Sequence, residues 1–380
     1  MDLKKNTKNY SPLPAEIELI LALLRPSVDE KRVACLTDRS ISWETTLVFG
    51  KNNGVLPLLH CVIEKLHPAI KNRLPELLRT TCQKYYDANL FRVLHLWKQF
   101  LLAFDHLREH AIEIIPLKGI IFAQHIYSDP AMRQIAADID ALVKKENLHQ
   151  AITLLQTRGY HISDQSEDNA VCLIGPNDVR FELHTEIMPA WLNRISANLL
   201  WERARAYEID TRTLRILSPE DTLASYPLQI RFHLPQLHLF RFLDIDRMLR
   251  NNQHTLDWDY LLSRAASWGS YHSLLFSIRI CYILFDSPTP PPILKLLHTR
   301  ISATGLYYGL FQKQLLRSYH SPYGSKHTTS SFSSALLKII LLGNIRDCAV
   351  MLWHKINNVW HHKKNTDKKT QYNPLLQGRA

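Results

Sequence analysis

Apolar residues recur at helical spacing over the first part of the chain, from Pro14 to about His110. Side chains three and four positions apart share one face of a helix, so this spacing predicts amphipathic helices. The clearest segments have their apolar positions at Ile17, Ile20, Leu21 and Leu24, and at Leu90, Val93, Leu94, Trp97, Leu101 and Phe104. We expect a flexible N-terminus over residues 1–13 and an N-terminal helical region over 14–110.

The pattern changes over residues 111–190, where short apolar runs alternate with short helical segments. Strands are predicted at 112–117, 138–143, 171–174 and 179–187, and helices at 119–127 and 147–158, the second ended by Gly159. A turn from Gly175 to Asp178 separates the last two strands. This order predicts a compact α+β domain of about 80 residues, small enough to need support from the helices around it.

Helical spacing returns after Ser218-Pro219-Glu220-Asp221, a typical helix start, and persists to about Val359. Ser42 and Asp257 each precede a tryptophan and suit the N-cap of a helix. The prolines at 288 and 290–292 predict a loop between helices, and the stretch 318–334 predicts a mobile one. We therefore expect a C-terminal helical domain over 191–360 and a basic tail over 361–380.

Composition supports a helical globular protein. Hydrophobic residues make up 46% of the chain and charged residues 21%, a balance that excludes a disordered chain, and 11 glycines in 380 residues argue against a many-turned all-β fold. The most apolar stretch, 335–353, is interrupted by Lys338, Arg346 and Asp347, so no transmembrane helix is expected. Six widely spaced cysteines predict reduced core residues, and the short apolar run at 19–24 is not a signal peptide, so a cytoplasmic location is expected.

The formal net charge of +11 raises the question of a nucleic acid or an anionic membrane as partner. Residues 336–360 also have a basic amphipathic character. However, lysines and arginines are spread along the chain, and no aromatic signature of RNA binding is present. A non-catalytic nucleotide- or nucleic-acid-binding protein is therefore the alternative, ranked below an enzyme.

The candidate chemistry lies between Leu117 and Val143. In the strand 138–143, Asp138 and Asp140 point to the same face, with α-carbons about 6.6 Å apart. Two unpaired carboxylates this close repel each other, and a bound cation would relieve the repulsion. Carboxylate oxygens suit Mg²⁺, which commonly shares its ligands with phosphate. The alternative is an exposed pair of aspartates satisfied by water or arginine.

Further residues around this pair suit phosphate or metal. Lys118-Gly119 stands where a strand meets a helix, and the free N–H groups at a helix N-terminus attract phosphate. Glu182 alternates with apolar neighbours in the last strand, so it is a candidate third carboxylate on the same face, or part of an ordinary edge strand with a solvated face. Arg133 either reaches a triphosphate bidentately or pairs with Asp129 or Asp138.

These residues together resemble the uncharacterised nucleotidyltransferase family of the polymerase-beta-like nucleotidyltransferase superfamily. The matching motifs are Leu117-Lys118-Gly119, Tyr127 to Arg133, Asp138 to Val143, Gly159-Tyr160 and Glu182-Leu183-His184. The resemblance extends outward through residues 41–60, 242–249 and 256–269 and covers roughly residues 15–295. The resemblance implies a minimal nucleotidyltransferase core with a mixed β-sheet, flanked by the N- and C-terminal helical regions. Lys-Gly stands where the wider superfamily usually has Gly-Ser or Gly-Gly, and Ala137, Ala141 and Pro116 also depart from its pattern, but no metal ligand is lost.

The resemblance also implies a reaction. Asp138, Asp140 and Glu182 would hold two Mg²⁺ ions, or Mn²⁺ in their place, and Lys118-Gly119 would bind the triphosphate. A nucleoside monophosphate would pass from a nucleoside triphosphate, for example ATP, to an acceptor while pyrophosphate leaves. His184 either contacts phosphate or acceptor or is hydrogen-bonded within the sheet. The acceptor, a small molecule or a protein, is left open by the sequence.

Overall fold

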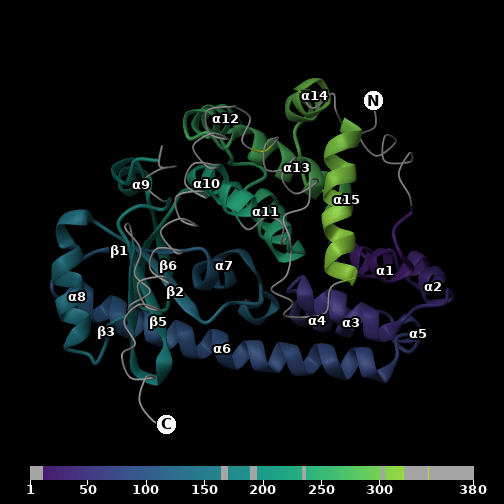
Figure 1. Ribbon diagram of the computed structural model, residues 1–380, viewed down its shortest axis with the longest axis horizontal. Helices are drawn as coiled ribbons and strands as arrows, with labels where there is room; N and C mark the ends of the chain where they lie inside the picture. The colour runs from purple at the N-terminus through teal and green to yellow at the C-terminus, as the bar shows by residue number, and fades with distance from the viewer. Residues whose placement is uncertain are drawn as a thin grey trace, which may run out of the picture.

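The computed structural model describes residues 12–163, 170–188, 195–232, 237–300, 304–320 and 341. Figure 1 shows a β-sheet at one end of the molecule, a group of N-terminal helices at the other, and C-terminal helices packed above both. The fold is therefore mixed α+β, as the sequence predicts. Predictions for residues 1–11, for the tail 361–380 and for 321–334 lie outside the described residues, as does most of 336–360.

The N-terminal region is helical, as predicted, and ends in one long helix. Its elements are α1 (Ala15–Leu23), α2 (Glu30–Thr37), α3 (Trp43–Asn52), α4 (Leu56–Glu64), α5 (Pro68–Lys71) and α6 (Glu76–Glu109). Ser42 caps α3 by accepting a hydrogen bond from the amide of Thr45, as predicted from its position before Trp43. Helix α6 runs beneath both the N-terminal helices and the sheet in Figure 1. Its two ends consequently belong to different hydrophobic clusters.

The five-stranded sheet has the order β1-β2-β5-β4-β3. Its strands are β1 (Ile114–Leu117), β2 (Asp138–Val143), β3 (His161–Ile162), β4 (Ala170–Ile174) and β5 (Arg180–His184). β2 and β5 pair in parallel, whereas the other pairs are antiparallel. The sequence predicts all of these strands except the two-residue β3. Because β5 lies between β2 and β4, it is a central strand and not the edge strand considered as an alternative.

The two faces of the sheet have different roles. Ile139, Ala141, Phe181 and Leu183 form part of a buried cluster with the second half of α6 and with α8 (Leu148–Gln156). Because side chains alternate along a strand, Asp138, Asp140, Glu182 and His184 lie on the opposite face. Leu117 and Leu142 on that face pack with α7 (Gly119–Ile126) and the C-terminal helices. The polar groups are therefore enclosed between the sheet and the helical region.

The C-terminal region is helical but begins with a short helix and a β-hairpin. The elements are α9 (Ala197–Arg203), β6 (Arg205–Ile209), β7 (Arg212–Ile216), α10 (Pro219–Phe232), α11 (Leu239–Asn251), α12 (Trp258–Ser267), α13 (Tyr271–Phe285), α14 (Pro291–Arg300) and α15 (Thr304–His320). The hairpin was not predicted from the sequence. Its tight turn contains Asp210 at φ 52°, and β7 lies beside β1. A loop with Pro288 and Pro290 lies between α13 and α14, as predicted, whereas Pro291 and Pro292 form the start of α14.

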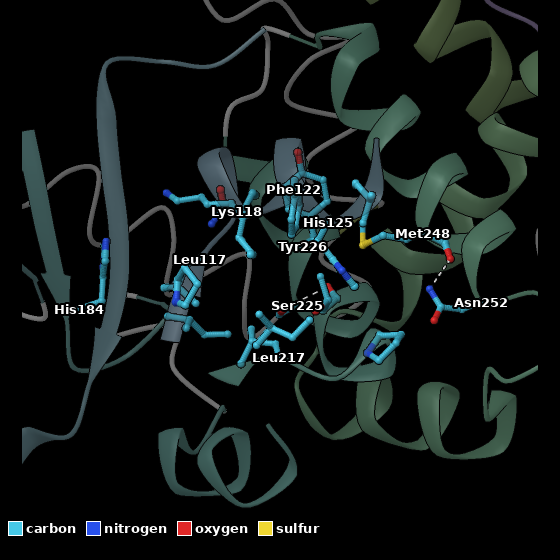
Figure 2. A pocket seen from close by; sticks show the side chains of 18 of the residues that line it. Leu117, Lys118, Phe122, His125, His184, Leu217, Ser225, Tyr226, Met248 and Asn252 are labelled. Carbon is cyan, nitrogen blue, oxygen red and sulfur yellow. Dashed lines mark hydrogen bonds between the residues drawn. The ribbon is translucent and has the colours of Figure 1, made fainter. Parts of the chain in front are cut away.

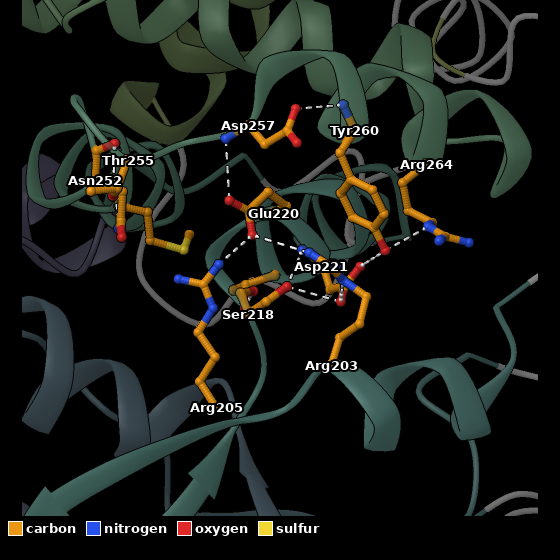
Figure 3. Close-up of polar contacts among 12 residues, drawn as sticks. Arg203, Arg205, Ser218, Glu220, Asp221, Asn252, Thr255, Asp257, Tyr260 and Arg264 are labelled. Atoms are coloured by element: carbon orange, nitrogen blue, oxygen red, sulfur yellow. Dashed lines mark hydrogen bonds and ion pairs between the residues drawn. The ribbon is translucent and has the colours of Figure 1, made fainter.

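A buried network of polar groups joins the hairpin to α10 and α12 (Figure 3). The Ser218 hydroxyl accepts a hydrogen bond from the Asp221 amide at the start of α10, in agreement with the predicted helix start. Glu220 pairs with Arg205 at 3.2 Å, and Asp221 pairs with Arg203 at 3.3 Å. Both carboxylates are buried, so these pairs satisfy charges that would otherwise be costly at a helix N-terminus packed inside the protein.

Two sequence expectations concern the chain as a whole. Among the described residues, no helix is long and apolar enough to cross a membrane. None of the five described cysteines forms a disulfide, and Cys82, Cys172 and Cys281 are buried as predicted. Cys35, in contrast, is exposed on α2 and is not a core residue.

Candidate active site

The parallel register of β2 and β5 brings the predicted acidic residues together. Asp140 lies opposite Glu182 on the neighbouring strand, and Asp138 lies opposite Arg180. Asp140 is only 3% exposed, whereas Asp138 and Glu182 are half-buried. Ligand atoms of Asp140, Glu182 and His184 all lie within 4.8 Å of one another. The structure thus places three carboxylates and one imidazole on a single face of the sheet.

Nearby cations neutralise part of this charge. Lys118 Nζ lies 3.1 Å from Asp140 Oδ1, and His184 Nε2 donates a hydrogen bond to the same oxygen at 3.0 Å. His184 Nε2 also lies 3.6 Å from Glu182 Oε2. Arg180 Nη2 donates to the other oxygen of Glu182 at 3.2 Å. His184 is thus hydrogen-bonded within the sheet. This is one of the two roles predicted for His184 from the sequence; the other was a contact with phosphate or acceptor.

The surroundings shift the pKa values of these groups in different directions. Burial raises the pKa of Asp138, and the neighbouring charge of Asp140 adds to that effect. Burial would also raise the pKa of Asp140, but Lys118 and the hydrogen bond from His184 outweigh it and lower the pKa. The hydrogen bond from His184 lowers the pKa of Glu182. Burial disfavours charge on His184, yet its bonds to Asp140 and Glu182 raise its pKa overall.

The turn between β1 and α7 presents a helix N-terminus beside these carboxylates. Lys118 has φ 32° and ψ −140°, an uncommon conformation for a residue with a side chain, and Gly119 has φ 24°. A Cβ placed on Gly119 would meet no atom within 4 Å. The space beside Gly119 is therefore open to a ligand, and the free amides of the first turn of α7 favour an anion there.

Arg133 has a different partner from those considered in the sequence analysis. Its Nε and Nη2 donate to the two carboxylate oxygens of Asp244 at 2.9 and 2.8 Å, and its side chain is 5% exposed. Tyr127 and Tyr226 donate to the same carboxylate. Arg133 Nη1 also donates to the carbonyl of Gly119 at 3.3 Å. Arg133 therefore stabilises the turn through its hydrogen bond to the carbonyl of Gly119. Its predicted contact with a triphosphate is replaced by a buried ion pair with Asp244.

A pocket, shown in Figure 2, is lined by Lys118 and His184, the two residues that contact Asp140. Lys118 and His184 lie on one side of it, and Met248 and Asn252 of α11 lie on the other. Residues of α7 and α10 form further walls. The contributions of α10 and α11 were not predicted from the sequence, because helical periodicity does not indicate that these helices pack near the sheet about 100 residues further along the chain.

The donor set fits a hard divalent cation. Carboxylate oxygens are the preferred ligands of Mg²⁺ and Mn²⁺, and three carboxylates are available here. Asp138 has a hydrogen bond to its own backbone but, among the described residues, forms no close ion pair with a lysine, arginine or histidine, so part of its carboxylate is available to a ligand. Its raised pKa reflects repulsion and burial, which a cation would offset.

The five-stranded sheet carries Asp138 and Asp140 beside the open N-terminus of α7. Residues 39–286 match the family described as "Uncharacterised nucleotidyltransferase", and the chain belongs to that family. No match is found among curated proteins.

Three solved structures show similarity at low sequence identity. The crystal structure of ANT(2")-Ia with adenylyl-2"-tobramycin is 12% identical over 46% of this chain and 95% of that chain, with a TM-score of 0.33. The solution structure of the antibiotic-resistance factor ANT(2'')-Ia is 12% identical over 50% and 93%, with a TM-score of 0.32. An antigenic nucleotidyltransferase-like protein from Paracoccidioides brasiliensis is 19% identical over 49% and 94%, with a TM-score of 0.31.

Proposed function

We propose that the protein transfers a nucleoside monophosphate from a nucleoside triphosphate to an acceptor hydroxyl or phosphate, with release of pyrophosphate. The observation that carries the proposal is the pairing of Asp140 with Glu182 across parallel strands, with Asp138 on the same face. Membership of a nucleotidyltransferase family supports the same reaction class. Mg²⁺, or Mn²⁺ in its place, is the proposed metal.

Each group of the site has a proposed role. Asp138, Asp140 and Glu182 would hold two divalent ions. Such ions, when bound, would lower the pKa of the acceptor and stabilise the leaving oxygens. Glu182, beside His184, would help to activate the acceptor. Lys118 and the amides of Gly119 and the first turn of α7 would bind the triphosphate, since they supply positive charge next to an open space.

Lys118 is placed to respond to the charge on Asp140. It pairs with a single oxygen of that carboxylate, and its own side chain is 31% exposed. A competing cation at Asp140 would weaken this ion pair by repulsion and free the ammonium for phosphate oxygens. Nucleotide and metal should therefore bind with positive coupling.

The proposal is tested by thermal unfolding of the purified protein with each of the four nucleoside triphosphates, with and without Mg²⁺. At least one triphosphate should raise the unfolding temperature, and Mg²⁺ should increase that effect. The double change Asp138→Asn/Asp140→Asn should abolish the Mg²⁺-dependent part while the circular dichroism spectrum stays unchanged. Transfer of label from an α-³²P triphosphate then reports the reaction itself.

Two results would overturn the proposal. One is the absence of any response to all four triphosphates in the presence of Mg²⁺. The other is a Mg²⁺-dependent part of the triphosphate response that the double Asp→Asn change leaves intact. Polynucleotide binding that weakens with salt and survives the double change would instead support a non-catalytic nucleic-acid-binding protein.

A further inference from the structure

The pocket beside the carboxylates is mostly apolar. Leu117, Phe122 and Ile126 come from β1 and α7, and Tyr226 and Met248 come from α10 and α11. These walls belong to elements of the sheet domain on one side and of the C-terminal helices on the other. A small molecule in this pocket would therefore lose most of its contact with water.

The charge of the pocket restricts what can bind. Among the described residues that line it, none is a glutamate or aspartate, and Lys118 is the sole lysine or arginine. Between α7, α10 and α11, away from the end formed by Lys118 and His184, a ligand ammonium group would lose its hydration without gaining a carboxylate partner. The pocket is therefore unsuited to a polyamine or another polycation, and an uncharged ligand avoids this penalty.

Two polar side chains in the wall have unused hydrogen-bonding capacity. Within the described part of the chain, neither the imidazole of His125 nor the amide of Gln229 has a hydrogen bond, although both line the pocket. His125 contacts the ring of Tyr207, with ring centroids 4.6 Å apart. Burial lowers the pKa of His125, which favours its neutral form. These groups can each donate or accept a hydrogen bond with a neutral ligand.

The pocket lies apart from the proposed triphosphate site, so the two sites can be assigned to different ligands. The open space beside Gly119 lies at the N-terminus of α7, whereas the pocket follows the flank of that helix from Ile121 to Ile126. The pocket also reaches His184, which lies 3.6 Å from Glu182. A molecule in the pocket could thus present a hydroxyl to Glu182 while the triphosphate occupies the helix N-terminus.

We infer that this pocket binds the acceptor, and that the acceptor is an uncharged, largely apolar alcohol or phenol. The inference rests on the proposed transferase function. The ring or hydrocarbon part of the acceptor packs between α7, α10 and α11, with its polar atoms against His125 and Gln229. Its hydroxyl points toward the end of the pocket formed by Lys118 and His184.

Binding of two matched small molecules tests this inference without requiring turnover. Tyrosol and tyramine share a phenol ring and differ in ending with a hydroxyl or an ammonium group. In saturation-transfer NMR with the full-length protein, tyrosol should give a signal at least about fivefold stronger than tyramine. Equal or stronger signals from tyramine would overturn the inferred charge selectivity.

Variants locate the binding site. Gln229→Trp places an indole in the pocket and should remove the tyrosol signal, whereas Gln83→Trp, on an exposed position of α6, should leave it unchanged. Gln229→Leu preserves size and removes the amide, so it should weaken tyrosol binding about two- to fivefold even if the tryptophan variant fails to fold. Tyrosol binding unaffected by the Gln229 variants would contradict the assignment.

The same variants separate this inference from the proposed function. Gln229→Trp should leave the thermal shift by triphosphate and Mg²⁺ intact, because the triphosphate is held elsewhere. Loss of that shift in a folded variant would show that the pocket holds the nucleobase, and would overturn the acceptor assignment. Tyrosol binding by a protein that ignores all triphosphates would instead refute the transferase proposal alone.

Discussion

Asp138 and Asp140 lie two residues apart on β2, yet their surroundings move their pKa values in opposite directions. Asp140 accepts contacts from Lys118 and His184, which stabilise its charge. Asp138 lies close to the charge of Asp140 and is desolvated, so its charged form is disfavoured. Without a metal, the site therefore holds one well-compensated carboxylate and one poorly compensated carboxylate.

This asymmetry predicts that Asp138→Asn raises the unfolding temperature of the metal-free protein at pH 7. Because the folded-state pKa of Asp138 is raised, its contribution to stability is fully present below the ordinary aspartate pKa. That contribution is lost as the pH rises through the raised value. Replacing the charge with an amide removes the penalty at pH 7, and the gain should disappear in acid. Thermal melts in a chelator at several pH values measure this.

Asp140→Asn is the matched control for that experiment. It leaves Lys118 and His184 without their main charged partner, so it should lower the unfolding temperature under the same conditions. If Asp138→Asn also lowers the unfolding temperature at pH 7, the account of repulsion at Asp138 is wrong.

At the scale of single residues, the sequence predicted which residues form the site better than it predicted the partners of their side chains. Alternation along the strands was enough to place Asp138, Asp140 and Glu182 on one face, because that property is local. The partner of Arg133 could not be predicted, because Asp244 lies 111 residues away on α11. Any of several aspartates would have suited the same guanidinium on local grounds.

The β1–α7 turn is the element that shapes the proposed phosphate site. Lys118 adopts a sparsely populated backbone conformation with positive φ, which costs a non-glycine residue about 1–3 kcal/mol. Strain of this kind persists where surrounding contacts hold it, and here the Lys118 side chain contacts Asp140 while Arg133 donates to the carbonyl of Gly119. The turn is thus stabilised by both Asp140 and Arg133, while the N-terminus of α7 stays accessible to a ligand.

Gly119→Ala should weaken triphosphate binding about tenfold. The new methyl group would project into the open space beside the helix N-terminus, and the positive φ of Gly119 would cost about 1 kcal/mol of stability. Calorimetric titration with the best triphosphate and Mg²⁺ measures the affinity.

Gly159→Ala is a suitable control because Gly159 also has positive φ, at 85°, and follows α8. A similar loss of stability is expected there, with no change in affinity. Equal losses of affinity in both variants would mean that general destabilisation, and not the space beside Gly119, controls binding.

Most elements were predictable from the spacing of apolar residues, and the exceptions have physical reasons. The helix starts at Ser42, Ser218 and Asp257 were found because capping depends on side chains within three residues. The β6–β7 hairpin was missed because β6 is half-exposed along its length and lacks a buried apolar face. Its stability comes instead from packing beside β1 and from the pairing of Arg212 with Asp105.

At the scale of the whole molecule, the buried carboxylate of Asp244 joins the sheet domain to the C-terminal helices. It lies on α11 and accepts hydrogen bonds from Arg133 and Tyr127 near the active site, and from Tyr226 on α10. Its side chain is fully buried. One charged centre therefore links the two parts of the molecule that form the pocket, in addition to their hydrophobic contacts.

Asp244→Asn should lower the free energy of unfolding by about 3 kcal/mol or more, because it leaves Arg133 charged and buried without a partner. Burial opposes the charge of Arg133, but the contact with Asp244 outweighs it and raises the pKa of Arg133, so the guanidinium remains charged in the wild type. Urea denaturation measures the difference.

The control is Asp38→Asn, which breaks an ion pair with Arg73 on the surface. The Asp38 side chain is 69% exposed, so the expected loss is below about 1 kcal/mol. Similar losses in the two variants would show that the buried centre does not hold the two parts together.

Helix α6 has a consequence for how this protein can be divided or engineered. Its first half packs through Leu78 and Cys82 with the N-terminal helices, and its second half packs through Phe100 and Leu107 against the sheet. Cutting the chain at residue 110, where the sequence pattern changes, would strip the sheet of the helix that covers its apolar face. The sheet is consequently not expected to fold without α6. A protein engineered to contain this sheet would need to include α6 as well.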